Sequence, residues 1–180
     1  GRAFKSYLPA PATTGTGAYQ ADPQSLGNTF YGDDRPFSQV LVYENSPLNR
    51  EKETIGAGKI WNDNNKKITH FYESAGTDVR YYYLDGSNNI KKSGNFPANS
   101  LFKKRTKDEE EHETISITDK RGRLIQSQQQ DATGYISTYY IYDGAGRTRA
   151  VIQPEGYELD SDIDNGSDAW NRWVFFFKYD

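Results

Sequence analysis

The residues that most often carry chemistry are scarce in this sequence. It contains two histidines, His70 and His112, and no cysteine. Nucleophilic catalysis requires a nucleophile, a base that activates it and a group that orients the base. His70 occupies an alternating strand-like position and His112 lies in an acidic stretch, so we interpret both as surface residues. We expect no catalytic residue and no cofactor, and nothing in the sequence fixes a carboxylate pair as a hydrolase would require.

Alternating carboxylates make one stretch a candidate calcium site. Within residues 158–168, Asp160, Asp162 and Asp164 could supply the oxygen ligands that a hard cation needs. The ligand order departs from a calcium-binding loop, because with Asp160 as its first position Asn165 falls where glycine belongs. We therefore interpret the stretch as a solvated acidic insertion that binds calcium weakly or not at all.

Aromatic rings are the other candidate binding groups. The chain has 14 Tyr, 9 Phe and 3 Trp. Sugars stack on exposed rings, whereas buried rings build the core of a sheet, and a patch of adjacent exposed rings would favour sugar binding. The sequence leaves both interpretations open. The candidate stacking residues are Trp61, Tyr81, Tyr83, Trp170 and Trp173.

Composition and charge narrow the class of protein. A length of 180 residues allows one sizeable domain or two small ones. A mean hydropathy of -0.92 is polar for a globular protein. Aromatic residues, which disordered chains lack, make up 14% of the sequence, so we expect the chain to be folded. A formal net charge of -3 provides no general attraction for nucleic acid, so we expect no nucleic-acid partner. No run approaches the ~18 apolar residues of a membrane helix, so we expect no membrane insertion.

The elements that must position these residues are predicted to be β-strands. From residue 38 onward, strand-like runs alternate with turn residues, and in residues 113–118 Ile115 and Ile117 share one face. We predict an all-β fold, an antiparallel sheet of stacked β-hairpins with at most one short helix, within residues 157–171. Residues 1–36 form an irregular N-terminal segment and residues 37–180 the hairpin region. The predicted strands are 39–44, 51–55, 68–73, 79–84, 101–107, 113–118, 123–127, 135–142, 147–152 and 173–179.

A turn motif recurs along the chain. Residues 142–147 read Tyr-Asp-Gly-Ala-Gly-Arg, residues 118–123 read Thr-Asp-Lys-Arg-Gly-Arg, and Tyr-Asp returns at 179–180. Looser copies lie at 43–50 and 83–89. Repeated turn signatures indicate repeated supersecondary units that stack on one another.

The spacing of the motif suits a tight hairpin turn. An Asp at the first position can accept backbone N–H bonds, and a Gly three residues later can adopt positive φ. We therefore expect turns at Asp119 to Arg123 and Asp143 to Arg147, with positive φ at Gly122 and Gly146. Each Arg should reach the turn Asp or the preceding Tyr ring, such as Tyr142 before the second turn.

The Tyr-Asp-x-x-Gly-Arg motif at 142–147 resembles the signature of Rhs proteins, also called YD-repeat proteins. The segment from residue 36 through Glu-Asn-Ser-Pro-Leu-Asn-Arg at 44–50 resembles the region that precedes such repeats in long bacterial surface proteins. The resemblance covers residues 36–180. It implies hairpins that wind into a shell, a cell-surface, cell-wall-associated or secreted location, and a scaffold associated with a toxin. The sequence departs from the pattern at Thr118, where the family has Tyr, and in its irregular repeat spacing.

The expected function is a non-enzymatic structural and interaction module that builds a β-hairpin shell or scaffold of a bacterial Rhs-type protein. The alternative is a carbohydrate-binding module on the same scaffold. The expected partners are the remainder of the parent chain and, under the alternative, glycans or other cell-surface molecules. Because the motif starts again at Tyr179, residues 173–179 should lie at a sheet edge or pair with an earlier strand.

Overall fold

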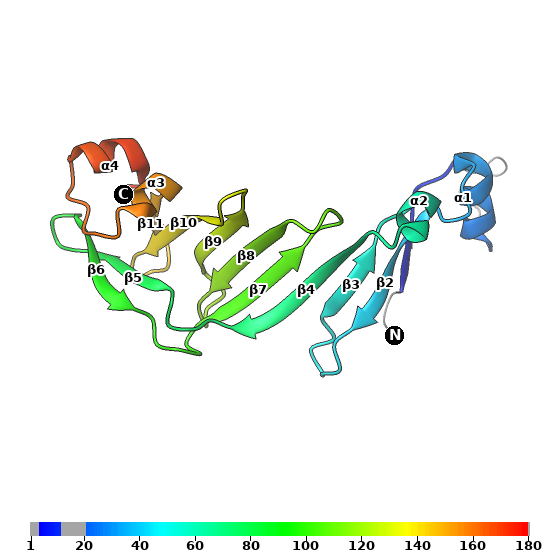
Figure 1. Ribbon diagram of the computed structural model, residues 1–180, viewed down its shortest axis with the longest axis horizontal. Coiled ribbons are helices and arrows are strands. Elements are labelled where there is room, and N and C mark those ends of the chain that lie inside the picture. The colour runs from blue at the N-terminus through cyan, green and yellow to red at the C-terminus, as the bar shows by residue number, and fades with distance from the viewer. Residues whose placement is uncertain (1–3, 12–20, 180) are drawn as a thin grey trace. The chain divides into compact units, whose positions relative to one another are not determined.

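The computed structural model describes residues 4–11 and 21–179 and is mainly antiparallel β, which confirms the predicted fold class (Figure 1). The chain forms two compact units, residues 1–71 with 106–112 and residues 72–105 with 113–180. The strands β4 (Lys67–Ser74) and β7 (Phe102–Lys107) each run from one unit into the other. The boundary expected at residue 36 therefore does not coincide with a boundary between compact units.

The first unit is a small antiparallel sheet with two helices. Its strands follow the order β1 (Lys5–Tyr7), β2 (Phe37–Tyr43), β3 (Glu51–Ile55) and β4. The short helix α2 (Lys59–Asp63) connects β3 to β4. The carboxylate of Asp33 accepts the backbone N–H of Lys59 at the start of α2, at 3.0 Å. A single side chain thereby fixes where α2 begins.

The segment expected to be irregular contains β1 and the helix α1 (Pro23–Tyr31), so that prediction was wrong in its described part. Asp22 caps the helix by accepting the N–H of Ser25 at 3.0 Å, and Pro23 begins it. Gly32, with φ of 64°, ends it. The sequence carried these cap signals. Residues 1–3 and 12–20 of the segment lie outside the described residues.

The second unit contains the main hydrophobic core. Its strands follow the order β7, β8, β9, β10, β11 and β12, with β5 and β6 forming a separate hairpin. On β8, Ile115 and Ile117 are buried, as their alternation predicted. β10, on the other side of β9 in the same sheet, buries Tyr139 and Ile141. The bounds are β5 (Arg80–Leu84), β6 (Ile90–Asn95), β8 (Glu113–Thr118), β9 (Leu124–Gln130), β10 (Tyr135–Tyr142), β11 (Thr148–Ile152) and β12 (Val174–Phe176).

Every predicted strand has a counterpart, but the helix count was wrong. Besides α1 and α2, the described residues include α3 (Pro154–Glu158) and α4 (Asp168–Trp173). Gly156 allows α3 to lie against α4, because a Cβ there would be 2.8 Å from the Cβ of Trp173. α4 occupies the start of the predicted strand 173–179, which is reduced to β12. As expected, β12 pairs with an earlier strand, β11, and is the last strand of its sheet.

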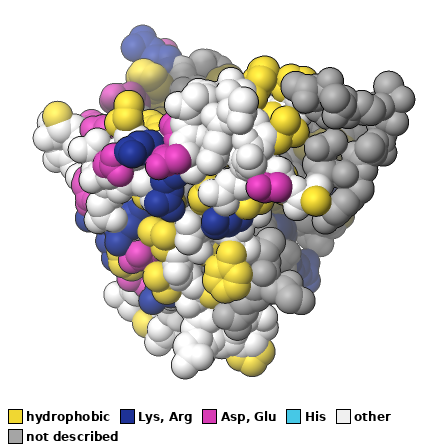
Figure 2. Space-filling model, turned by 90° about the vertical axis from the view of Figure 1, so that its right-hand side faces the viewer, with side chains coloured by type: hydrophobic (Ala, Val, Ile, Leu, Met, Phe, Trp, Pro, Cys, Tyr) yellow, Lys and Arg dark blue, Asp and Glu magenta, His cyan; other side chains and the backbone are white. Residues whose placement is uncertain are grey.

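One face of the molecule mixes polar and hydrophobic side chains (Figure 2). On the face drawn in Figure 2, hydrophobic side chains lie scattered among basic and acidic ones and do not form one continuous patch. Among the described residues, no helix is both long and apolar enough to cross a membrane.

Candidate functional site

Four turns in the described part of the chain share one construction, which we call the acid turn. In each, the first residue, an Asp, donates its N–H to the carbonyl of the fifth residue and accepts the N–H of the fourth, at 2.9 to 3.1 Å. The fourth residue is left-handed, with φ of 79° at Gly122 and 86° at Gly146, which confirms the predicted conformation. The acid turns are residues 85–89, 108–112, 119–123 and 143–147.

The Asp side chain closes each acid turn a second time. At Asp119, one carboxylate oxygen accepts the N–H of Arg123 at 2.9 Å and the other accepts its Nε at 2.7 Å. Asp143 holds Arg147 in the same way, with both bonds at 2.9 Å. The backbone N–H of Arg147 is the largest cause that lowers the pKa of Asp143. These carboxylates are therefore charged near neutral pH and committed to the turns.

Each Arg of the two best motif copies also lies over a tyrosine ring of the next copy. The Arg123 guanidinium is 5.0 Å from the ring centroid of Tyr142, whose hydroxyl donates to the carbonyl of Leu124 at 2.8 Å. The Arg147 guanidinium is 4.9 Å from the ring of Tyr179, whose hydroxyl donates to the carbonyl of Thr148 at 2.8 Å.

We call this pair of contacts the repeat lock. Its geometry corrects one expectation. The Arg contacts the turn Asp, as predicted, but its ring partner is the Tyr of the following motif copy and not the Tyr of its own copy. The repeat lock therefore joins successive copies, whereas the predicted contact would have stayed within one copy.

A longer version of the turn lies in the first unit. Glu44 donates its N–H to the carbonyl of Arg50 at 2.9 Å and binds the Arg50 side chain through Nε and Nη2 at 2.9 and 2.8 Å. The left-handed position is taken by Asn49, with φ of 52°. Hydrogen bonds from the Arg50 side chain are the main cause that lowers the pKa of Glu44 to about 2. The looser motif copy at 43–50 thus keeps the ion pair.

One acid turn was missed from the sequence, at Asp108 to His112. Its fourth residue is Glu111, with φ of 67°, and the fifth is His112, whose Nδ1 lies 3.4 Å from the Asp108 carboxylate. The only signal was an Asp four residues before a side chain able to donate. His70 was expected on a strand, and on β4 its Nδ1 lies 3.1 Å from the Thr106 hydroxyl.

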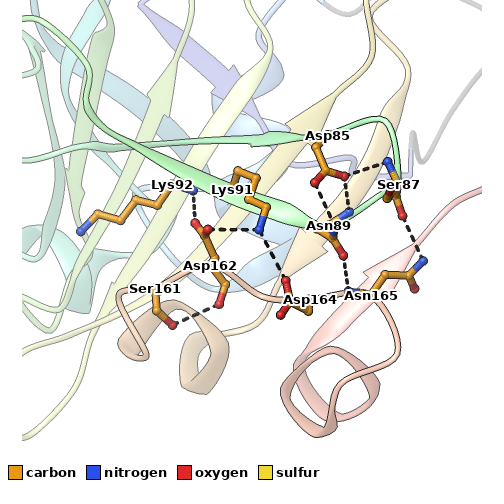
Figure 3. A network of polar contacts seen from close by, with 9 residues as sticks. All are labelled: Asp85, Ser87, Asn89, Lys91, Lys92, Ser161, Asp162, Asp164 and Asn165. Atoms are coloured by element: carbon orange, nitrogen blue, oxygen red, sulfur yellow. Dashed lines mark hydrogen bonds and ion pairs between the residues drawn. The ribbon is translucent and has the colours of Figure 1, made fainter.

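The candidate calcium residues Asp160, Asp162 and Asp164 form a different structure with basic residues, which we call the acidic clasp; Figure 3 shows Asp162 and Asp164 with Lys91 and Lys92. The loop between α3 and α4 lies along β6, where Ile163 and Ile90 exchange both backbone hydrogen bonds at 2.9 Å. Around this bridge, the loop carboxylates meet cations of the β5–β6 hairpin. The ion pairs are Arg80 with Asp160 at 2.8 Å, Lys92 with Asp160 at 2.6 Å, Lys91 with Asp162 at 3.2 Å, and Lys91 with Asp164 at 3.5 Å.

These contacts orient the carboxylates toward amines. Asp162 also accepts the N–H of Lys92 at 2.8 Å, the largest cause that lowers its pKa. The Lys92 side chain is the main cause that lowers the pKa of Asp160. Within the described ranges, no three His, Cys, Asp or Glu side chains gather in a way that could hold a metal ion. The stretch that was interpreted as a solvated insertion is a structural part of the second unit.

The candidate stacking rings differ widely in their exposure. Trp61 lies on α2 in the first unit and is 40% exposed, whereas Trp170 is 8% exposed and packs against Phe176. Trp170 is therefore a core residue and is not accessible to a sugar. Trp173 is half-buried where α4 meets α3. Neither tryptophan of the second unit belongs to an exposed pair.

Tyr81 and Tyr83 do form an exposed pair. Each is 41% exposed, and their rings stack with centroids 6.2 Å apart. The rings of Phe96 and Tyr81 make an edge-to-face contact, with their centroids 4.9 Å apart. These rings line a pocket of about 290 Å³ within the second unit, whose other wall includes Arg123 and Tyr142. We call it the tyrosine pocket. Its further lining residues are Tyr82, Asp119, Ile125, Tyr139, Tyr140 and Ile141.

Comparison with known proteins bears on the first unit. Residues 1–74 match a sequence family described as Domain of unknown function (DUF6443). The match ends inside β4, close to residue 71, where the chain passes into the second unit. No curated protein matches the chain. The matched segment therefore covers most of the first compact unit, which also includes residues 106–112.

Proposed function

We propose that this chain is a non-enzymatic structural and interaction module of a bacterial Rhs-type surface or secreted protein. In this proposal its β-hairpins form part of a shell or scaffold whose main partner is the rest of the parent chain. The repeat lock is the observation that carries the proposal. In two motif copies the Asp holds the Arg of its own turn, and that Arg contacts the Tyr of the next copy. Side chains used in this way serve assembly, as in repeat proteins whose units contact their neighbours.

A double-mutant cycle tests the structural part of the proposal. Arg123→Met and Tyr142→Leu should each destabilise the chain, and the two effects together should be less than additive because the side chains share one contact. The matched cycle at Arg147 and Tyr179 should give a coupling of similar size. Additive effects at both sites would contradict a lock between copies.

A protease experiment tests the location. Trypsin added to intact cells that produce the parent protein should remove this region, while a cytoplasmic marker stays whole. For a secreted form, the region should appear in the medium. Protection until the cells are lysed would overturn the surface or secreted location.

We propose carbohydrate binding on the same scaffold as a second candidate function. One observation favours it, the adjacent exposed rings of Tyr81 and Tyr83. Sugars present C–H faces that pack on such rings and hydroxyls that reach polar groups beside them. A glycan array probed with the intact chain tests this function, and the absence of binding to every glycan would overturn it.

A further inference from the structure

We infer that the tyrosine pocket binds the ring of a neutral sugar, between the β5–β6 hairpin and the turn at Asp119 to Arg123. The inference rests on carbohydrate binding, the second candidate function, and gives it a site and a ligand class. It follows from the polar groups that the pocket offers, from their charge and from the space between them.

The pocket offers phenolic hydroxyls. In the described parts of the chain, the hydroxyls of Tyr81, Tyr83 and Tyr140 have no hydrogen-bond partner. The Tyr142 hydroxyl, in contrast, donates a hydrogen bond to the Leu124 carbonyl. A phenol can both donate and accept a hydrogen bond. Tyrosine rings with free hydroxyls, together with lining residues such as Ile125 and Ile141, suit a ligand that is itself a ring carrying hydroxyls.

The charges of the pocket cancel. The Asp119 carboxylate accepts the backbone N–H groups of Arg121 and Arg123 at one oxygen and two nitrogens of the Arg123 side chain at the other. Both oxygens are therefore occupied, and the Arg123 charge is neutralised by Asp119. An acidic sugar would gain no unpaired cation here, so the pocket favours a neutral one.

The size of the pocket selects a single ring over an extended chain. A volume of about 290 Å³ lies at the lower end of small-molecule sites. The Tyr81 and Tyr83 rings lie beside this space with their planes at 28° to each other, so either ring can offer a face to the ligand. A proline-rich peptide, which also docks on aromatic grooves, needs a longer surface to place successive residues.

Calorimetry with defined sugars tests the inference. The probes are maltotetraose, cellotetraose, chitotetraose and mannotetraose, with tetragalacturonate as the acidic probe and a proline-rich decapeptide as the rival ligand. At least one neutral probe should bind the intact chain. Tyr81→Ala and Tyr83→Ala should each weaken its binding about tenfold, because each removes a stacking face. Tyr83→Phe, which keeps the ring, should have a smaller effect.

Phe102→Ala is the matched control, because Phe102 is 57% exposed in the second unit but lies outside the pocket. It should leave sugar binding unchanged. Nuclear magnetic resonance on the unaltered chain keeps the test valid if a variant misfolds. The ring signals of Tyr81 and Tyr83 should shift on titration, whereas those of Tyr135, equally exposed at 41%, should not.

The outcomes separate the site from the function. If a neutral sugar binds but neither the variants nor the ring signals respond, the site is wrong and carbohydrate binding stands. If only the acidic probe or the peptide binds, the ligand class is wrong. If no glycan binds in either format, both the site and the second candidate function are overturned.

Discussion

At the scale of single residues, the residue type at the fourth position of each acid turn determined whether that turn could be predicted from the sequence. At residues 122 and 146 it is glycine, the residue that adopts positive φ without a steric penalty, so the turns were predictable. In the other two acid turns the fourth residue is Asn88 or Glu111. These residues adopt the same left-handed conformation although they are not glycine, with φ of 63° and 67°. Glutamate seldom takes this conformation, so the Asp108 turn could not be predicted from residue type.

Gly146→Ala should destabilise the chain by about 1 kcal/mol or more, because alanine is strained at positive φ. Urea denaturation of the variant measures the change. Gly144→Ala is the matched control: it lies in the same turn, is not among the positive-φ glycines, and an added Cβ meets nothing within 4 Å. Equal stability of the two variants would contradict the assigned turn geometry.

Tyr142→Phe should lower the free energy of unfolding by about 1 kcal/mol, because it removes the hydrogen bond to the Leu124 carbonyl but keeps the ring over Arg123. The control is Tyr140→Phe on the same strand, whose hydroxyl has no partner among the described residues and whose loss should be near neutral. Chemical denaturation of both variants measures the two changes in the free energy of unfolding. A larger effect at Tyr140 would argue against the repeat lock.

At the scale of elements, the strands were predictable because alternation and turn residues recorded them locally. One short helix was predicted within residues 157–171, where α4 begins, but α3 and α4 carry too few residues for a helical period to define their bounds. Their start signals are single residues, such as Ser167, whose hydroxyl accepts the N–H of Trp170 at 3.2 Å. The β6 strand was also missed, since its sequence is polar and its burial depends on the distant Ile163.

The departure at Thr118 also has an explanation at this scale. In the repeat lock, a Tyr at the end of one strand covers the Arg that begins the neighbouring strand. β8 ends at Thr118, and its neighbour β7 begins at Phe102, with no acid turn and no Arg before it. A tyrosine at residue 118 would therefore lack the partner that Tyr142 has.

The acidic clasp leads to a prediction about calcium. Calorimetry should detect no micromolar binding to the intact chain, because Asp160, Asp162 and Asp164 face lysine and arginine side chains. A cation would have to displace these amines. Micromolar affinity that is lost in Asp162→Asn would contradict the prediction, and Asp168→Asn, outside the clasp, serves as the control.

At the scale of the whole molecule, the two units bury very different amounts of apolar surface. In the described part of the first unit, the buried apolar side chains are Pro36, Phe37 and Ile55, whereas the other core residues belong to the second. Burial of apolar surface is the main source of stability. Contacts between distant residues decide this difference, so the sequence alone could not reveal it.

Hydrogen exchange followed by mass spectrometry should reflect this difference. Amides of β2 should exchange faster than those of β10, although each strand pairs on both sides. Local opening is easier where few buried contacts must break. Both strands have a partner on each side, so equal protection would show that the first unit draws stability from contacts other than its own core.

The chain should lose stability in acid. The pKa of Glu44 is lowered from 4.5 to about 2, and those of Asp119 and Asp143 lie below 3.8. Folded carboxyls with lowered pKa values add stability above their unfolded pKa values, and this is lost as pH falls through the folded ones. The urea midpoint should therefore fall as pH drops from 4.5 toward 2. Glu44→Gln should reduce this dependence, and an unchanged midpoint over that interval would contradict it.

The candidate site was only partly visible in the sequence. Tyr81 and Tyr83 could be named because aromatic residues at alternate positions of a strand share a face. Their association with Arg123 and Tyr142 could not, because it depends on how the β5–β6 hairpin packs on β10. Trp170 was wrongly included among the stacking candidates, because its residue type suits a sugar but its side chain is buried in the core.

The repeat lock has a direction along the chain. Tyr142 closes over a turn that precedes it in the sequence, and so does Tyr179. Each Tyr therefore completes a contact with a turn made before it, and the Arg of each copy stays uncovered until the Tyr of the next copy follows. Chains that emerge from their N-terminus first can add such hairpins one by one, in the order of synthesis, with little unpaired edge exposed at any moment.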